Sequence, residues 1–249
     1  MITRIHSFSE GWSDPKRVKA LFVPGGNASE MWIADLKEAV DSVREVILKY
    51  SIGYYGACAG GIIATSSHFE RTYVGTTSQS LGFKTKAYSF LQLFPSSDIA
   101  PLIPIVNRPK FSAADFALRP IRLTSGKVMT TAHILGTGYL DVRVTEETDI
   151  LATYTDLAAQ TFLPQETIVP ERICESLCYK PEGKGVVVLT GSHPEIDSQS
   201  VMHEEFKSAF NMSDREQQAA AETLRGGDAE RKFLLRENFE RMGIHCKKV

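Results

Sequence analysis

The stretch at residues 52–64 places the strongest constraint on what this chain can fold into. Its first part is rich in residues that favour a β-strand, namely Ile52, Tyr54 and Tyr55. Around its centre lie glycines, where a side chain would block the close approach of neighbouring backbone: Gly56, Gly60 and Gly61. Cys58 lies between these glycines. The pattern predicts a strand, a sharp turn and a helix start, the elbow that holds a nucleophile out of a sheet.

Cys58 has two interpretations. An unpaired cysteine is most often a small buried hydrophobic residue, but such a residue needs no glycines on both sides of it. In an elbow, the amides at the start of the following helix point at the sulfur and favour the thiolate, which is the reactive form. The flanking glycines therefore favour a nucleophile.

A second feature lies late in the chain, at residues 184–195. A predicted strand at residues 186–189 ends in a turn that carries His193, and Glu195 follows two residues later. Taken alone, a histidine in a loop and a surface carboxylate would be the simpler interpretations. Together with Cys58 they supply a nucleophile, a base and an acid that orients the base. We therefore predict a Cys58–His193–Glu195 triad.

At these two stretches the chain resembles the class I glutamine amidotransferase-like superfamily. Within that superfamily it is most similar to the domain found at the N-terminus of eukaryotic biotin-protein ligases, which also occurs as a stand-alone bacterial protein. The branch is matched by the strand end at residues 22–26, by residues 189–195, and by a closing helix that ends near residues 242–243. The resemblance runs from about residue 18 to the C-terminus.

The alternation of strand and helix predicts an α/β fold of the flavodoxin-like, doubly wound class, with a mostly parallel sheet and helices on both faces. We expect one domain over residues 1–249. The early strands are predicted at residues 2–8, at 18–23 and from Ile52 to the elbow, with a helix over residues 31–50 and another after Cys58 that ends near residue 69. A β-rich region is inserted over residues 73–156, with short strands at 90–94, 121–124, 127–134, 139–142 and 150–154. Later strands are predicted at 173–179 and 186–189, before two outer helices over 213–241, broken by Gly226 and Gly227.

The N-terminus departs from the family pattern. The family's fold places a strand and a helix before the segment at residues 2–8, and that strand is central in the sheet. A sheet that lacks its centre would leave backbone groups unpaired. Three alternatives follow: this chain starts late, another element takes the central position, or a second copy of the chain does so in a homodimer.

The residues after the strand at 18–23 are candidates for an oxyanion site. The amides of Gly25 and Gly26 end this strand beside the elbow, and the amide of Ala59 would be a further donor to a developing oxyanion. A plain tight turn is the alternative interpretation of the two glycines. Asn27 is a candidate for lining the same pocket.

Two further cysteines, Cys174 and Cys178, are expected to have structural roles. Cys174 and Cys178 lie four residues apart on a predicted strand, so we expect their side chains to share a face. No paired histidines complete a metal-binding set with them. We therefore predict core or edge thiols, no metal site and no cofactor.

Charge and composition disfavour several classes of partner. A net charge of -2 gives no electrostatic reason to bind nucleic acid or an anionic membrane. No apolar run approaches the ~20 residues of a membrane helix, and the first residues lack the pattern of a signal peptide. The four cysteines are scattered, which fits a reducing cytoplasm.

The leading functional prediction is a cysteine-dependent amidohydrolase or amide-transfer enzyme acting on a small-molecule or other amide. The resemblance implies Gln four residues after the nucleophile of a glutaminase, but that residue here is Ile62, which disfavours glutamine as the substrate. The sequence signature of biotin ligation is absent, so this chain alone should not ligate biotin. The alternative is a non-catalytic binding or regulatory module associated with a biotin-protein ligase or a biotin-dependent carboxylase.

Overall fold

The structure of the chain is a computed structural model that describes residues 15–25, 39–65, 91–95, 99–101, 116–134, 137–139, 145–155 and 174–245. The predicted strand at residues 2–8 lies outside these ranges, as do Gly26 and Asn27. A short 3-10 helix, η1 (Pro15–Arg17), precedes the first described strand.

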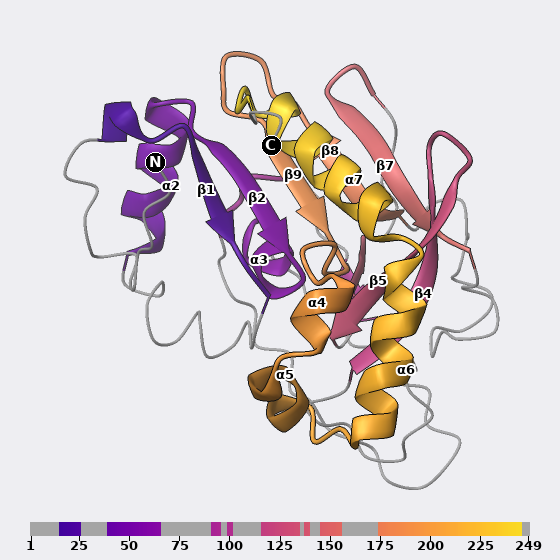
Figure 1. Cartoon of the computed structure of the whole chain (residues 1–249). Coiled ribbons are helices and arrows are strands. Elements are labelled where there is room, and N and C mark those ends of the chain that lie inside the picture. Colours follow the sequence, from indigo (N-terminus) through magenta and orange to yellow (C-terminus); the bar gives the residue numbers. More distant parts are fainter. Residues whose placement is uncertain are drawn as a thin grey trace, which may run out of the picture.

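One twisted sheet runs through the described residues (Figure 1). Its main path takes the order β1 (Ala20–Val23), β2 (Gly53–Ala57), β9 (Val187–Thr190), β8 (Cys174–Tyr179), β7 (Thr148–Tyr154), β4 (Phe116–Leu123) and β5 (Val128–Ile134). Strands β1, β2 and β9 are parallel, and the later neighbours along the path are antiparallel. Two short strands, β3 (Ile99–Pro101) and β6 (Thr137–Tyr139), pair with each other, and β6 also pairs with β8. The predicted α/β class with a β-rich insertion is confirmed. The described sheet is mixed and not mostly parallel, because only the β1–β2 and β2–β9 pairs are parallel, and the strands of the insertion and β8 pair antiparallel.

Helices cover both faces of the parallel strands. On one face, α2 (Val40–Lys49) and α3 (Ala59–Ile63) contribute to a core that includes Tyr54 and Leu189. On the other, α7 (Asp228–Arg241) packs its apolar residues against Tyr55 and Val188. Figure 1 shows α7 running along this face of the sheet. Because residues that alternate along β2 and β9 enter different cores, both faces of these strands are buried, as is usual in a parallel sheet.

The C-terminal helices begin and end where the sequence pattern indicates. After α4 (Ser198–Val201) and α5 (Glu204–Ala209), helix α6 (Asp214–Arg225) begins with a capping box between Ser213 and Glu216. Gly226 is the C-cap of α6, and Gly227 is the N-cap of α7. The two predicted helices over residues 213–241 are thus confirmed.

Two details of the predicted strands are wrong. The segment at 90–94 was expected to be a strand, but Leu91 and Leu93 are buried core residues outside any strand, and Phe94 forms only an isolated bridge to Thr65. Strand β4 is longer than predicted and includes Pro120, which lies opposite Thr130 of β5. Proline cannot donate a backbone hydrogen bond to a neighbouring strand, yet the pairing with β5 continues on both sides of Pro120.

The expectation that Cys174 and Cys178 share a face is also wrong. Cys174 enters the core beside α2 and α3, whereas Cys178 enters the core beside α7. The reason is an irregular register, because Thr153 of β7 pairs with Cys174 and Ala152 pairs with Ser176. Glu175 is the extra residue of this β-bulge, which shifts the alternation of side chains by one.

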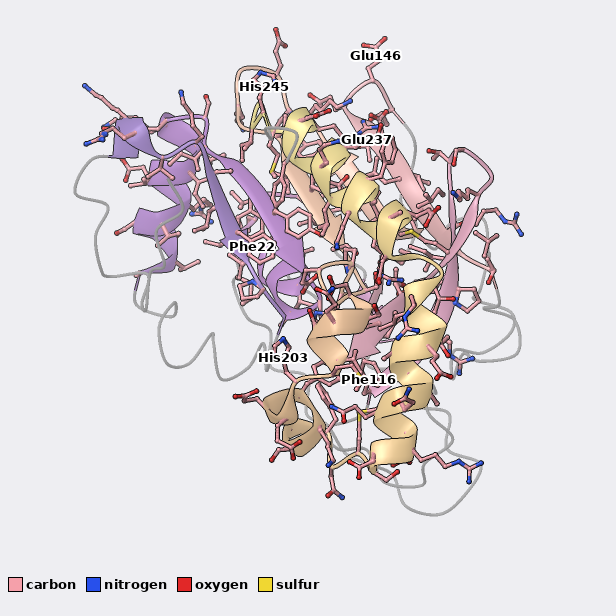
Figure 2. The ribbon with its side chains drawn as sticks, viewed as in Figure 1. Phe22, Phe116, Glu146, His203, Glu237 and His245 are labelled. Carbon is pink, nitrogen blue, oxygen red and sulfur yellow. The ribbon has the colours of Figure 1, made fainter. Side chains whose placement is uncertain are left out.

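Strand β1 ends the strand order of the described sheet. Phe22 on this strand, labelled in Figure 2, is 41% exposed and stacks on Tyr55 with 4.9 Å between ring centroids. The three alternatives for the family's missing central strand stay predictions. Within the described residues, no helix has the length and apolar character needed to cross a membrane.

The register of the parallel strands brings three chain segments to one edge of the sheet. Val23 lies opposite Gly56, and Ala57 lies opposite Thr190. All three strands therefore end together, and the residues that follow them, Gly25, Cys58 and His193, come from one edge. The carboxyl ends of parallel strands are where α/β proteins build their ligand sites.

Candidate active site

Cys58 occupies a strained turn between β2 and α3. Its backbone has φ 49° and ψ -109°, a left-handed φ that a residue with a side chain rarely adopts. The amide of Cys58 donates a hydrogen bond to the Thr190 carbonyl at 2.8 Å, and the Cys58 carbonyl accepts one from the amide of Ile62 at 3.1 Å. Such strain persists only where the surrounding structure fixes it, and it is common at functional sites.

The glycines around Cys58 are required by close backbone contacts. A Cβ on Gly56 would lie 2.6 Å from the carbonyl oxygen of Gly60. A Cβ on Gly60 would lie 2.1 Å from the carbonyl oxygen of Val23. The buried Tyr54 hydroxyl also donates to the Gly60 carbonyl at 2.7 Å. The turn is therefore packed against β1 and β2 with no room for a side chain.

Replacing Gly60 with alanine is expected to lower the free energy of unfolding by about 2–3 kcal/mol, because the added methyl meets fixed backbone. Denaturant titration of the variant would measure this loss. Gly226→Ala is the matched control, since a Cβ there meets nothing within 4 Å and its φ is -63°. Equal stability of the two variants would contradict the packing described for the elbow.

His193 lies on the turn after β9 and is held from two directions. Its amide donates to the carbonyl of Ala132 on β5 at 2.8 Å, so the inserted region of the sheet fixes its backbone. Its ring Nδ1 lies 2.8 Å from Oε1 of Glu195. With Nδ1–H donating to that carboxylate, the other ring nitrogen, Nε2, is left to act towards a neighbour.

The neighbour on that side is Cys58. A point at the ideal Cβ position of Gly25 lies 2.8 Å from Nε2 of His193 and 3.2 Å from Cβ of Cys58. The same point lies 2.0 Å from Cε1 of the imidazole. Gly25 thus adjoins both side chains, and the structure brings Cys58 next to His193 and Glu195, which lie far later in the sequence.

The surroundings of His193 decide its charge. Burial lowers its pKa, but hydrogen bonding to Cys58 and to Glu195, together with the charge of the Glu195 carboxylate, raises the pKa from its ordinary value of 6.5 to about 10. This direction favours the protonated imidazole. A protonated imidazole beside a cysteine favours the thiolate and holds a proton that can be given to a leaving group.

The remaining predicted residues have mixed outcomes. Ala59 is the buried first residue of α3, directly after Cys58, and Gly25 is in place beside it. The roles of Gly26 and Asn27 stay predictions, because both residues lie outside the described ranges. Ile62, at the position of the glutaminase Gln, is buried in the core beside α2, so its side chain has a packing role.

The sequence interpretation missed Glu175 and His133. Glu175 is fully buried on β8, and its Oε1 accepts from Thr190 Oγ1 at 2.7 Å and from the Ser192 amide at 2.8 Å. His133 is fully buried on β5, next to the residue that binds the His193 amide, and its Nε2 lies 2.9 Å from Thr131 Oγ1. The sequence signal that could have identified both residues is a titratable side chain within a predicted buried strand.

His133 is expected to make stability depend on acid. Burial, the positive charge of His193 and that of Arg119 lower the pKa of His133 from 6.5 to about 3. The unfolded chain therefore binds a proton below pH 6.5 that the folded chain does not, and stability is lost as pH falls from 6.5 towards 3. Between pH 6.5 and about pH 4 the loss from this residue should be on the order of 3 kcal/mol.

The measurement for this prediction is the free energy of unfolding against pH for the native chain and for His133→Gln. The variant should lose less stability on acidification, whatever its stability at pH 7, because Gln does not titrate. Parallel curves for the two proteins would show that His133 is not held neutral.

Among the described residues, no group of three or more His, Cys, Asp or Glu side chains is arranged to hold a metal ion.

Comparison with known proteins agrees with the family suggested by these residues. The model of the family "Biotin-protein ligase, N terminal" matches residues 123–249, just over half of the chain. No curated protein matches the chain.

Two similar solved structures are glutamine amidotransferases. One is 18% identical, with a TM-score of 0.44, over 78% of this chain and 80% of that chain. The other, from Thermotoga maritima, is 13% identical, with a TM-score of 0.45, over 89% of this chain and 77% of that chain. By the family match, the chain belongs to the biotin-protein ligase N-terminal domain family.

Proposed function

We propose that this glutamine amidotransferase-like protein is a cysteine-dependent amidohydrolase or amide-transfer enzyme. The observation that carries the proposal is the arrangement of His193, with Glu195 on Nδ1 and Cys58 on the side of Nε2. The raised pKa of His193 supports a proton on the imidazole that can be given to a leaving group. In this proposal Cys58 is the nucleophile, His193 the general acid and base, and Glu195 the group that orients the imidazole.

The chemistry follows from these roles. The Cys58 thiolate attacks the carbonyl carbon of an amide, and the carbon–nitrogen bond breaks as His193 gives its proton to the leaving amine. His193, now neutral, takes a proton from water, which attacks the thioester and releases the acid and the Cys58 thiolate. The amides of Gly25 and Ala59 are proposed as donors to the oxyanion, since both residues adjoin Cys58.

The substrate is proposed to be an amide other than free glutamine. Ile62 replaces the glutaminase Gln and its side chain is buried in the core, so it offers no polar group to a glutamine side chain. A reducing cytoplasm suits the proposed chemistry, because the Cys58 thiol must stay reduced, and none of the three described cysteines forms a disulfide.

A second candidate function is a binding or regulatory module for a biotin-protein ligase or a biotin-dependent carboxylase. The family match favours it, as does burial: Cys58 and His193 are each only 4% exposed. A buried thiol needs a change of conformation before it can meet a substrate, whereas a module needs none at this position. The Cys58–His193–Glu195 arrangement argues for the enzyme, since a module gains nothing from it.

Alkylation of Cys58 against pH separates the two candidates. The enzyme proposal predicts that a chloroketone or iodoacetamide probe labels Cys58 near neutral pH, with Cys58→Ser as the blank and His193→Ala slowing the labelling. Cys178→Ser is the control, because that thiol lies in the core beside α7. Labelling of Cys58 only above pH ~8.5, the value of a free thiol, with no response to His193→Ala, would reject the enzyme. Copurification with a biotin-protein ligase would then support the module.

A further inference from the structure

Glu175 is a buried carboxylate that the proposed triad does not use. It is fully shielded from solvent, on the strand next to the one that leads to His193. It is also the extra residue of the β-bulge in β8. Bulges re-aim a side chain and are frequent beside active sites, so the position of Glu175 calls for a specific partner.

That partner is the turn that carries His193. The carboxylate Oε1 accepts hydrogen bonds from the hydroxyl of Thr190 and from the amide of Ser192, at 2.7 and 2.8 Å. The backbone carbonyl of Glu175 accepts from the amide of Gly191 at 2.7 Å. One residue therefore binds the three consecutive residues that immediately precede His193.

The arrangement leaves the turn little freedom. Glu175 holds it from β8, and the carbonyl of Ala132 holds the His193 amide from β5. The amides of Ser192 and His193 are thereby held by two different strands, and the imidazole of His193 is held by Glu195. Hydrogen bonds from the turn satisfy Oε1 of Glu175, whereas Oε2 is buried with no hydrogen-bond partner among the described residues.

We propose that Glu175 is a positioning residue that fixes the 190–193 turn so that His193 meets Glu195 through Nδ1 and Cys58 through Nε2. This role rests on the proposed function, because its purpose is to hold the imidazole for the chemistry of Cys58. It acts through backbone geometry: the groups that raise the pKa of His193 are Cys58 and Glu195, and Glu175 is not among them.

The test uses the full chain with Glu175→Ala, Glu175→Gln and, as the control, Ser176→Ala. Ser176 is the next residue on the same strand, buried, with a hydroxyl that makes no hydrogen bond among the described residues. Two quantities are measured for each variant: the rate of Cys58 alkylation by iodoacetamide at pH 7, and the midpoint of the His193 titration from its ring signals by nuclear magnetic resonance.

Glu175→Ala should slow alkylation by about tenfold or more, since a small misplacement of a catalytic group is costly. It should also move the His193 midpoint from about 10 towards its ordinary 6.5. Glu175→Gln should stay within about threefold of the native rate, because its carbonyl oxygen can accept both hydrogen bonds. Ser176→Ala should match the native chain. Thr190→Val, which removes only the hydroxyl donor, should have an intermediate effect and serves if Glu175→Ala does not fold.

Folded Glu175→Ala or Thr190→Val with native alkylation and a native His193 midpoint would overturn the proposal. So would Glu175→Gln as impaired as Glu175→Ala, because charge and not position would then be responsible. The proposed function fails separately, if the native chain itself shows no His193-dependent alkylation. In that event the His193 midpoint still reports whether Glu175 positions the turn.

Discussion

His193→Ala is expected to lower the rate of amide hydrolysis by about 10²–10⁴-fold, the range contributed by a positioned general acid and base. The physical reason is that the variant loses both the proton for the leaving amine and the cation beside the Cys58 sulfur. The measurement is turnover of a panel of small amides, with Cys58→Ala giving the background. The effect should fall on kcat, because the imidazole acts on the reacting atoms and not on binding alone.

Two variants make this prediction specific. Glu195→Ala removes the partner of Nδ1 and should have a smaller effect, since it loosens the imidazole without removing it. His203→Ala is the matched control: His203, labelled in Figure 2, is an exposed histidine at the N-cap of α5. Turnover by His193→Ala at the native rate, or an equal loss in His203→Ala, would exclude the assigned role of His193.

The sequence was sufficient for the elbow and the histidine turn because each is a local pattern. Glycines on both sides of Cys58 require a tight turn wherever they occur, and the structure explains two of them by backbone atoms closer than 3 Å to a hypothetical Cβ. The strand before His193 is an apolar run, and all four of its residues are buried. Both features can therefore be predicted from a few neighbouring residues, without knowledge of how distant strands pair.

The contributions of β5 and β8 to the site could not be predicted in this way. Ala132 binds the His193 amide across 61 positions of the chain, and nothing in its neighbours distinguishes it from another strand residue. The bulge at Glu175 depends on how β7 pairs with β8, which the sequence of either strand alone does not specify. An alternation rule therefore assigned Cys174 and Cys178 to one face, and the bulge placed them on two.

A substitution at Gly25 is expected to affect catalysis much more than stability. A Cβ at this residue would lie 2.0 Å from Cε1 of His193, whereas at Gly60 it would meet the backbone of Val23. The obstacle at Gly25 is thus the imidazole ring and not backbone, and displacing the ring breaks its alignment with Cys58 and with Glu195. Gly25→Ala is therefore expected to lower turnover by about 10²-fold or more, the effect of misplacing a catalytic group by about 1 Å, with a loss of stability of only about 1 kcal/mol.

Turnover and denaturant titration of Gly25→Ala, measured beside Gly226→Ala, would check both halves of this prediction. Gly226 has open space around it, so its variant should keep native turnover and native stability. Alkylation of Cys58 in Gly25→Ala should slow as it does in His193→Ala, because the same imidazole is removed from the sulfur. A Gly25→Ala protein with native turnover would mean that His193 reaches Cys58 by another path, and the geometry assigned to the pair would be incorrect.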